Sequence, residues 1–205
     1  MPSIRLLKNG AEAFPAMFDA IDRAVSSVAL EMYIYADDGT GREFRGRLVN
    51  AARRGVQVMV LVDAVGSWSL PEAFWDALQT AGGLVRRFRP VSRGMFLFRN
   101  HRKLVLVDDR TAFIGGLNIA DEYFHGREGE PPWRDNALEI TGDEVLRLRR
   151  SFDRMWKGAD LPLLKAVLAP HGQREGKTAD GPLRFLESGP EDPLQHVRQA
   201  YREII

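Results

Sequence analysis

The sequence predicts a layered α/β domain built on a mixed β-sheet. Apolar strand-like runs alternate with amphipathic helix-like segments through the first half of the chain, which is the pattern of a sheet covered by helices. From His101 onward the chain reads as a strand, a tight turn and a return strand, so part of the sheet is antiparallel. With 205 residues and 44% hydrophobic content, the chain can bury one sizeable core and leave a short remainder.

The elements of the first half follow from hydrophobic periodicity and from glycine stops. Helices are expected where apolar residues recur every three to four positions, and they end where Gly55 and the pair Gly82 and Gly83 interrupt the pattern. Strands are expected where short apolar runs fall between the helices. In chain order, these predictions are a helix at 11–25, a strand at 28–35, a helix at 42–54, a strand at 56–62, a helix at 70–81 and a strand at 84–88.

The second half begins with the hairpin and ends with a helix. Its short apolar runs and its turn residues fix the boundaries. The predictions are a strand at 101–107, a turn at 108–110, a return strand at 111–115, a strand at 136–140 and a helix at 143–156. Asp143 is expected to cap the N-terminus of that last helix, because an aspartate side chain can accept from the free N–H groups there.

The end of the chain resembles its beginning. LRFLESGPE, which starts at Leu183, aligns without a gap with IRLLKNGAE, which starts at Ile4, and a helix pattern follows each. A self-match of this kind indicates an internal duplication. We therefore expect a first domain at 1–158, a Gly- and Pro-rich connector at 159–182, and the start of a second, truncated repeat at 183–205.

Composition excludes several classes of protein. The chain has no cysteine, so disulfides and thiolate metal sites are excluded. It has no apolar run of about 18 residues, the length that a transmembrane helix needs. Its opening lacks the apolar core of a signal peptide, so none is expected. The net charge of +1 does not identify a partner.

Basic residues are nevertheless concentrated in one segment. Seven Lys and Arg residues and no acid lie between Arg86 and Lys103. Such a local field attracts phosphates, lipid headgroups or nucleic acid, although an ordinary solvated basic face has the same composition. Within the run, the apolar residues MFLF at 95–98 are typical either of a lipid-contacting patch or of a short buried strand.

His101 and Lys103 lie at the head of the strand predicted at 101–107. Side chains alternate along a strand, so these two share one face, with Cα atoms roughly 6.5–7 Å apart. The nearby ammonium disfavours the charged imidazole, and a neutral imidazole is a nucleophile or a base. The ammonium can bind a phosphate oxygen. The pair therefore suits attack on phosphorus, where catalysis depends on positioning and charge stabilisation.

The residues after the hairpin extend this pattern. Gly115 and Gly116 allow the backbone to pass close to a bound group, and Asn118 supplies an amide donor. Each piece also has a structural explanation, such as a turn former at Asp108 or a bulge at the glycine pair. The joint pattern H-x-K-x4-D followed by G-G-x-N is far rarer than its parts, and it favours a site.

This pattern resembles the HKD motif of the phospholipase D superfamily. His101, Lys103 and Asp108 match the motif, and residues 115–118 match the segment that follows it. LEMYIYADDGTG, AARRGVQVMVLVDAVGS, RNHRKLVLVDDRTAFIGGLNIADEY and PWRDNALEITG are similar to phrases in the N-terminal half of bacterial cardiolipin synthases. The resemblance implies a phospholipase D-like mixed sheet with helices on both faces, in α-β-α layers.

The resemblance also implies a reaction. In this family one histidine attacks the phosphodiester and forms a covalent phosphohistidine, and a histidine from a second motif protonates the leaving alcohol. No metal or other cofactor is needed. In cardiolipin synthases one phosphatidylglycerol donates its phosphatidyl group to another, and glycerol leaves.

The same resemblance assigns roles to catalytic residues. His101 would be the nucleophile or the acid, and Lys103 and Asn118 would hold phosphate oxygens. Asp108 belongs to the motif, but its position at the turn favours a structural role. Asp135 resembles the carboxylate that orients the histidine ring through its other nitrogen.

Four further residues are expected at the substrate. They are the glycine pair Gly115 and Gly116, Arg102 in the basic run, and Glu31 in the strand at 28–35. For Glu31 a second interpretation is equally open, namely a buried acid paired with a basic residue.

The chain carries one HKD motif. His125, His171 and His196 have no lysine two positions later, so the second motif is expected from a missing C-terminal half or from a homodimer. The alternatives are a phosphodiesterase that acts on nucleic acid and an inactive half domain. Nucleic acid is disfavoured as a partner because the longer phrases fit the lipid synthases better.

The expected partners are an anionic phospholipid and a membrane surface. The chain is expected to be cytoplasmic and peripheral to the inner face of the cell membrane. The patch at 95–98 is one point of contact in the lipid-contacting interpretation, and it is a short buried strand in the other. Trp68 is either an interfacial anchor or a core residue, and Trp75 is expected in the core.

Overall fold

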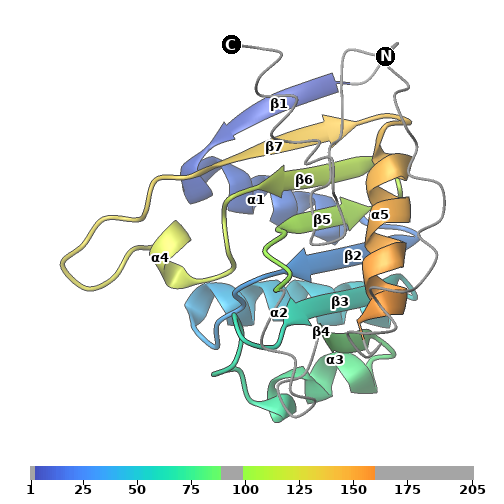
Figure 1. The fold of residues 1–205 in the computed structure, drawn as a ribbon, viewed down its shortest axis with the longest axis horizontal. Coiled ribbons are helices and arrows are strands. Elements are labelled where there is room, and N and C mark those ends of the chain that lie inside the picture. Colours follow the sequence, from blue (N-terminus) through green and yellow to red (C-terminus); the bar gives the residue numbers. More distant parts are fainter. Residues whose placement is uncertain (1–2, 89–98, 160–205) are drawn as a thin grey trace. The chain divides into compact units, whose positions relative to one another are not determined.

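A computed structural model describes residues 3–88 and 99–159. In these ranges the chain forms a seven-stranded sheet with the order β1-β7-β6-β5-β2-β3-β4. In chain order the elements are β1 Ser3–Lys8, α1 Asn9–Arg23, β2 Ser27–Met32, α2 Gly39–Arg53, β3 Gln57–Asp63, the 3₁₀ turn η1 Glu72–Trp75, α3 Asp76–Thr80, β4 Leu84–Phe88, β5 Leu104–Val107, β6 Thr111–Gly115, α4 Asp121–Phe124, β7 Asn136–Thr141 and α5 Val145–Gly158 (Figure 1).

The sheet is mixed, as predicted. β2, β3 and β4 are parallel to one another, whereas β5, β6, β7 and β1 follow in antiparallel pairs. Figure 1 shows α5 on one face of the sheet and α1 and α2 on the other. The predicted α-β-α layering is therefore confirmed.

The two faces of the sheet bury different side chains. Phe14 of α1 and Phe44 of α2 are buried in one core with Leu30 and Val105 of the central strands. On the opposite face α5 buries Phe152 against the sheet. Because strand residues alternate between faces, every second residue of β2 and β5 belongs to each layer.

Several predicted boundaries are wrong. The strand predicted at 101–107 begins only at Leu104, because Asn100 accepts the Arg102 N–H and turns the chain before the strand. The strand predicted at 28–35 ends at Met32. The N-cap of α5 is Glu144, without a side-chain capping bond, and not Asp143.

Smaller differences concern short elements. The helix predicted at 70–81 consists of the short turn η1 and α3. Trp75 is buried there, as expected, whereas Trp68 is 78% exposed. The apolar patch at 95–98, the connector from residue 160 to 182 and the repeat at 183–205 lie outside the described residues. No described helix is long and apolar enough to cross a membrane.

Asp108 fixes the turn between β5 and β6. Asp108 and Asp109 both adopt positive φ, 53° and 52°, the backbone that tight hairpin turns require. The Asp108 carboxylate accepts backbone N–H groups from the loop before β2, at 3.0 Å from Val25, 2.7 Å from Ser26 and 2.9 Å from Ser27. These contacts agree with the expected structural role of Asp108.

The same contacts set the charge of Asp108. Partial burial by itself would raise the pKa of its carboxyl, but the N–H groups of Ser27, Ser26 and Val25 and the Ser26 hydroxyl outweigh burial and lower the pKa. A lowered pKa in the folded state contributes stability above the unfolded value of about 3.9. That contribution is lost as the pH falls through the folded pKa.

We expect Asp108→Asn to lower the free energy of unfolding by about 2 kcal/mol at pH 7, because an amide turns an N–H toward these donors. Asn tolerates positive φ, so the turn itself is not strained. Urea unfolding followed by circular dichroism measures the loss, and the gap to the wild type should narrow below about pH 4.

Asp109→Asn is the matched control. Asp109 has the same backbone conformation, but its part-exposed carboxylate pairs with one side chain, that of Arg149, at 3.2 Å. It should cost no more than about 1 kcal/mol. Equal losses in the two variants would contradict the structural role given to Asp108.

Candidate active site

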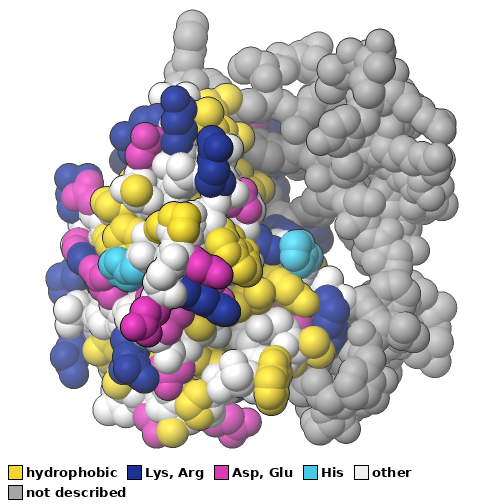
Figure 2. All heavy atoms as spheres, turned by 90° about the vertical axis from the view of Figure 1, so that its left-hand side faces the viewer, with side chains coloured by type: hydrophobic (Ala, Val, Ile, Leu, Met, Phe, Trp, Pro, Cys, Tyr) yellow, Lys and Arg dark blue, Asp and Glu magenta, His cyan; other side chains and the backbone are white. Residues whose placement is uncertain are grey.

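Most of the predicted site residues gather at one edge of the sheet, whereas Asp108 lies at the opposite end of β5. Because β5 runs antiparallel to β2, its N-terminal end lies beside the C-terminal ends of β2 and β3. The C-terminal end of β6 and the N-terminal end of β7 reach the same edge. Figure 2 faces this edge and shows histidine side chains among hydrophobic, basic and acidic ones.

His101 is exposed at this edge. Its ring lies 4.6 Å from the ring of Tyr33, the residue that follows β2. Partial desolvation and the nearby Lys103 ammonium lower the pKa of His101, and the Asp63 carboxylate opposes them. The imidazole is therefore held toward its neutral form, as the sequence predicts.

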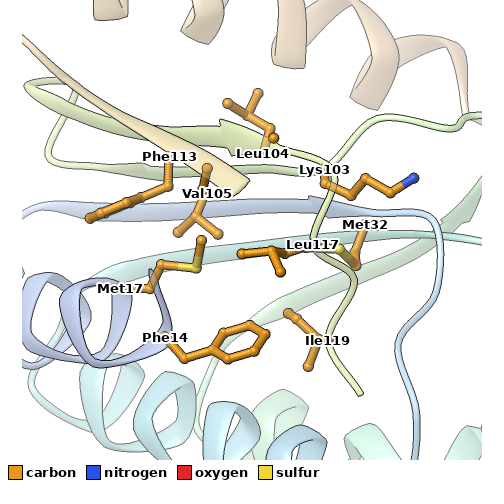
Figure 3. A pocket seen from close by; sticks show the side chains of 11 residues that line it. Phe14, Met17, Met32, Lys103, Leu104, Val105, Phe113, Leu117 and Ile119 are labelled. Carbon is orange, nitrogen blue, oxygen red and sulfur yellow. The ribbon is translucent and has the colours of Figure 1, made fainter. Parts of the chain in front are cut away.

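Lys103 is buried, with 7% of its surface exposed. Its Nζ donates to the backbone carbonyl of His101 at 3.0 Å and lies 5.1 Å from the centre of the Tyr33 ring. Figure 3 shows the aliphatic stem beside Leu117 and Met32, with the amine pointing away from the apolar side chains. Burial lowers the pKa of Lys103 to about 8, although Asp135 attracts the charge and opposes the fall.

Asp135 lies against Gly116, and its charge acts on Lys103. Its Oδ1 accepts the N–H of Asn136 at 2.8 Å. The carboxylate whose charge acts on His101 is that of Asp63. Orientation of the His101 ring by Asp135 therefore stays a prediction.

The glycine pair allows close contact within the protein. A Cβ atom on Gly115 would lie 2.2 Å from the Asn136 carbonyl oxygen, and one on Gly116 would lie 2.2 Å from the Asp135 carboxylate. The sequence predicts a close approach to a bound group. In this structure the groups that lie close to the two glycines are Asn136 of β7 and Asp135, the residue before it. The pair lets Asp135 reach the edge beside Lys103.

Asn118 is held by two protein groups. Its Oδ1 accepts the N–H of Ile34 at 3.1 Å, and its Nδ2 donates to the Tyr123 hydroxyl at 2.8 Å. An amide nitrogen carries two donors, so one N–H is not used by Tyr123. These bonds fix the amide to the loop after β2, and contact with phosphate stays a prediction.

Glu31 and Arg102 pair with each other. Glu31 is completely buried on β2, and its Oε2 lies 3.3 Å from an Arg102 guanidinium nitrogen. Of the two interpretations left open for Glu31, the structure shows the buried acid paired with a basic residue. Contact of Glu31 with substrate stays a prediction, and so does contact of Arg102, which is partly exposed.

Three residues at this edge are not predicted from the sequence as site residues. Tyr33 packs against both His101 and Lys103. Asp63 ends β3 and is completely buried. Asn100, which is 3% exposed, precedes His101 and binds to Asp63. Of the three, Asp63 could have been found from the sequence, because it is the polar residue that ends the apolar strand VQVMVLVD, and a buried carboxylate there needs partners.

The arrangement suits an anionic phosphodiester and attack by an imidazole. An exposed imidazole lies beside a buried ammonium, and the aromatic ring of Tyr33 packs against both. Among the described residues, no group of three or more acidic or histidine side chains is placed to hold a metal ion.

Comparisons with known proteins agree with this geometry. Residues 17–156 match the family model described as "Cardiolipin synthase, PLD-like domain". Cardiolipin synthase A of Pseudomonas fluorescens strain SBW25 is 38% identical over 209 residues, and cardiolipin synthase of Geobacillus thermodenitrificans is 36% identical over 208. Each alignment covers 98% of this chain but 42% and 41% of the relative, so the chain spans about two fifths of their length.

Solved structures share the fold. The phospholipase D family member Nuc from Salmonella typhimurium gives a TM-score of 0.60 at 20% identity, over 77% of this chain and 95% of that one. Phosphatidylserine synthase of Haemophilus influenzae gives 0.59 at 21% identity, over 78% of this chain and 36% of that one. From its sequence, its mixed sheet and the His101 and Lys103 of its HKD motif at the sheet edge, the chain belongs to the phospholipase D-like domain family of cardiolipin synthases.

Proposed function

We propose that the chain provides one catalytic half of a phosphatidyltransferase of the cardiolipin synthase type. Its substrates would be two phosphatidylglycerol molecules, and its products cardiolipin and glycerol. The observation that carries the proposal is the exposed His101 imidazole, whose pKa is lowered beside the buried Lys103 ammonium. The relatives with this name, 34–38% identical over nearly the whole chain, support the choice of substrate.

The proposed reaction has two steps, both balanced at phosphorus. In the first, a ring nitrogen of one histidine forms a P–N bond, the bond to the glycerol oxygen breaks, and a second histidine gives that oxygen a proton. In the second, the hydroxyl of another phosphatidylglycerol attacks, the same second histidine takes its proton, and the P–N bond breaks. His101 would serve as one of the two histidines.

The remaining roles follow from position at the edge. Lys103 would attract a phosphate oxygen, with the free N–H of Asn118 as a further donor. Arg102 is partly exposed and would contact the anionic substrate. Asp135 would orient the imidazole in the complete site, in addition to its effect on Lys103.

The second histidine would come from outside the described part of this chain. We propose either the rest of a longer protein, which the coverage of 42% of a relative supports, or a second copy of the chain. The residues at 183–205, which resemble the first strand and helix, would then begin the second half.

We further propose that the chain works on the inner face of the cell membrane as a peripheral protein. Trp68, 78% exposed, and Trp133, 50% exposed, lie in loops next to β3 and β7 at the site edge. Indole rings favour the membrane–water interface, since they combine an apolar ring with a polar N–H. Two such loops would direct the site toward a lipid surface.

The first test is conversion of phosphatidylglycerol vesicles, followed by mass spectrometry of cardiolipin and release of glycerol. His101→Ala should lower turnover by at least about 1,000-fold, because it removes a reacting group. His125→Ala is the matched control, since that histidine has no lysine two positions later, and it should keep wild-type turnover. Cleavage of single-stranded DNA, lost in His101→Ala and without cardiolipin formation, would instead favour a nuclease.

Turnover should follow a bell-shaped pH profile. If His101 is the attacking histidine, turnover should rise as the pH passes the pKa of His101, which lies below its ordinary value of about 6.5, because the neutral imidazole attacks. It should fall as Lys103 loses its proton near its pKa of about 8. Lys103→Arg should move the falling limb to higher pH, and an unchanged falling limb would contradict the role of the ammonium.

The source of the second histidine predicts a concentration dependence. If two copies complete the site, turnover per chain should rise with protein concentration, and mixing His101→Ala with wild type should lower turnover more than dilution does. Sedimentation velocity over the same concentrations should show a dimer. Turnover proportional to protein concentration, with a monomer throughout, would contradict the homodimer.

A further inference from the structure

Two buried carboxylates lie side by side under the segment that carries His101. Glu31 on β2 pairs with Leu61 on the parallel strand β3, so Asp63, two residues later, points to the same face as Glu31. Both side chains are 0% exposed. Buried carboxylates are costly without hydrogen-bonded or charged partners, so their partners indicate what this pair does.

The two carboxylates share one partner, Asn100. The Asp63 Oδ2 accepts the backbone N–H of Asn100 at 2.9 Å, and the Glu31 Oε1 accepts its side-chain Nδ2–H at 2.5 Å. The Asn100 Oδ1 in turn accepts the backbone N–H of Arg102 at 3.3 Å. Asn100 is therefore bound at three points, and the third bond spans His101.

Basic residues on both sides complete the arrangement. A guanidinium nitrogen of Arg99 lies 3.6 Å from Asp63, and one of Arg102 lies 3.3 Å from Glu31. The Asp63 Oδ1 also accepts the N–H groups of Val65 and Gly66, at 2.8 and 3.0 Å. The residues before and after His101 are thus tied to two adjacent strands of the rigid sheet.

We propose that Asn100 is a positioning residue for His101, held between the buried carboxylates of Glu31 and Asp63. The inference rests on the proposed function only in that His101 is taken as a reacting group. Asn100 would not touch the reacting atoms. It fixes the backbone on which the imidazole is mounted.

His101 is an exposed side chain that must point accurately to react. The ring of His101 is exposed and contacts Tyr33, so side-chain packing restrains the ring on one side only. β5 begins only at Leu104, so the sheet ladder does not hold residues 100–102. The bonds of Asn100 replace the ladder there. Because a shift of about 1 Å at a reacting group can cost about 100-fold in rate, such bonds matter to catalysis.

Two substitutions at Asn100 separate positioning from general stability. Asn100→Ala removes the bond to Glu31 and the bond from the Arg102 N–H. Asn100→Ser keeps a short acceptor for Arg102 but is too short to reach Glu31, so its effect should be intermediate. Ser26→Ala is the matched control, because it removes one hydrogen bond to a carboxylate, Asp108, at the opposite end of β5.

The kinetic readout uses phosphatidylglycerol vesicles and the full chain. We expect kcat to fall about 100-fold in Asn100→Ala with KM within about threefold, since the imidazole is misplaced while substrate contacts remain. Asn100→Ser should fall between Asn100→Ala and wild type, and Ser26→Ala should stay within about twofold. A loss in kcat no greater than that of Ser26→Ala would overturn the proposal.

The second readout needs no turnover, so it stands if the proposed function fails. NMR titration follows the His101 imidazole, whose neighbours are Lys103, Asp63 and Tyr33. In both Asn100 variants the midpoint should rise toward about 6.5, because the ring leaves its partly desolvated place beside Lys103. A midpoint unchanged from wild type in the folded Asn100→Ser variant would overturn the positioning role. A wild type that shows the shift but makes no cardiolipin, even when the second half is supplied, would count against the proposed function alone.

Discussion

The antiparallel pairing of β5 with β2, in the middle of the sheet, is the constraint on which the candidate site depends. β2 and β3 are parallel, so this single reversal brings their C-terminal ends to the point where β5 begins. The next two reversals carry the end of β6 and the start of β7 to the same edge. Residues separated by about a hundred positions, such as Glu31 and Asp135, reach one edge through hydrogen-bonded register. Asp108, at the other end of β5, instead anchors the hairpin.

Strand alternation then divides the charged groups between the two faces. Lys103 is directed to the face of α1, where its stem lies over apolar side chains, and Arg102 to the face of α5, where it meets Glu31. The ammonium is thereby separated from the Glu31 carboxylate, which Arg102 and Asn100 occupy. Lys103 therefore forms no ion pair with Glu31, and its ammonium stays available to bind an anion beside His101.

Local chemistry made much of this predictable from the sequence. Hydrophobic runs, glycine stops and the hairpin turn gave the mixed sheet, and the HKD spacing identified His101 and Lys103. The strand predicted at 101–107 was wrong at its start because the side chain of Asn100 competes with the ladder for the Arg102 N–H. The partnership of Asn100 with Asp63 and Glu31 could not be predicted, since it depends on the register of β2 against β3 and on where β5 begins. The glycine pair was predicted to approach a bound group, which stays a prediction; its close neighbours in the structure, on and just before β7, follow only from strand order.

Removal from water at the sheet edge shifts the titration of both His101 and Lys103. It lowers the pKa of each group, so each carries less positive charge at a given pH. A different carboxylate opposes the lowered pKa of each group: Asp63 acts on His101, and Asp135 acts on Lys103. With the imidazole below its ordinary value and the lysine near 8, a pH interval remains in which the first is neutral and the second charged. Asp135 therefore contributes to the site whether or not it also contacts the imidazole, since without its charge Lys103 would lose its proton at lower pH and the interval would shrink.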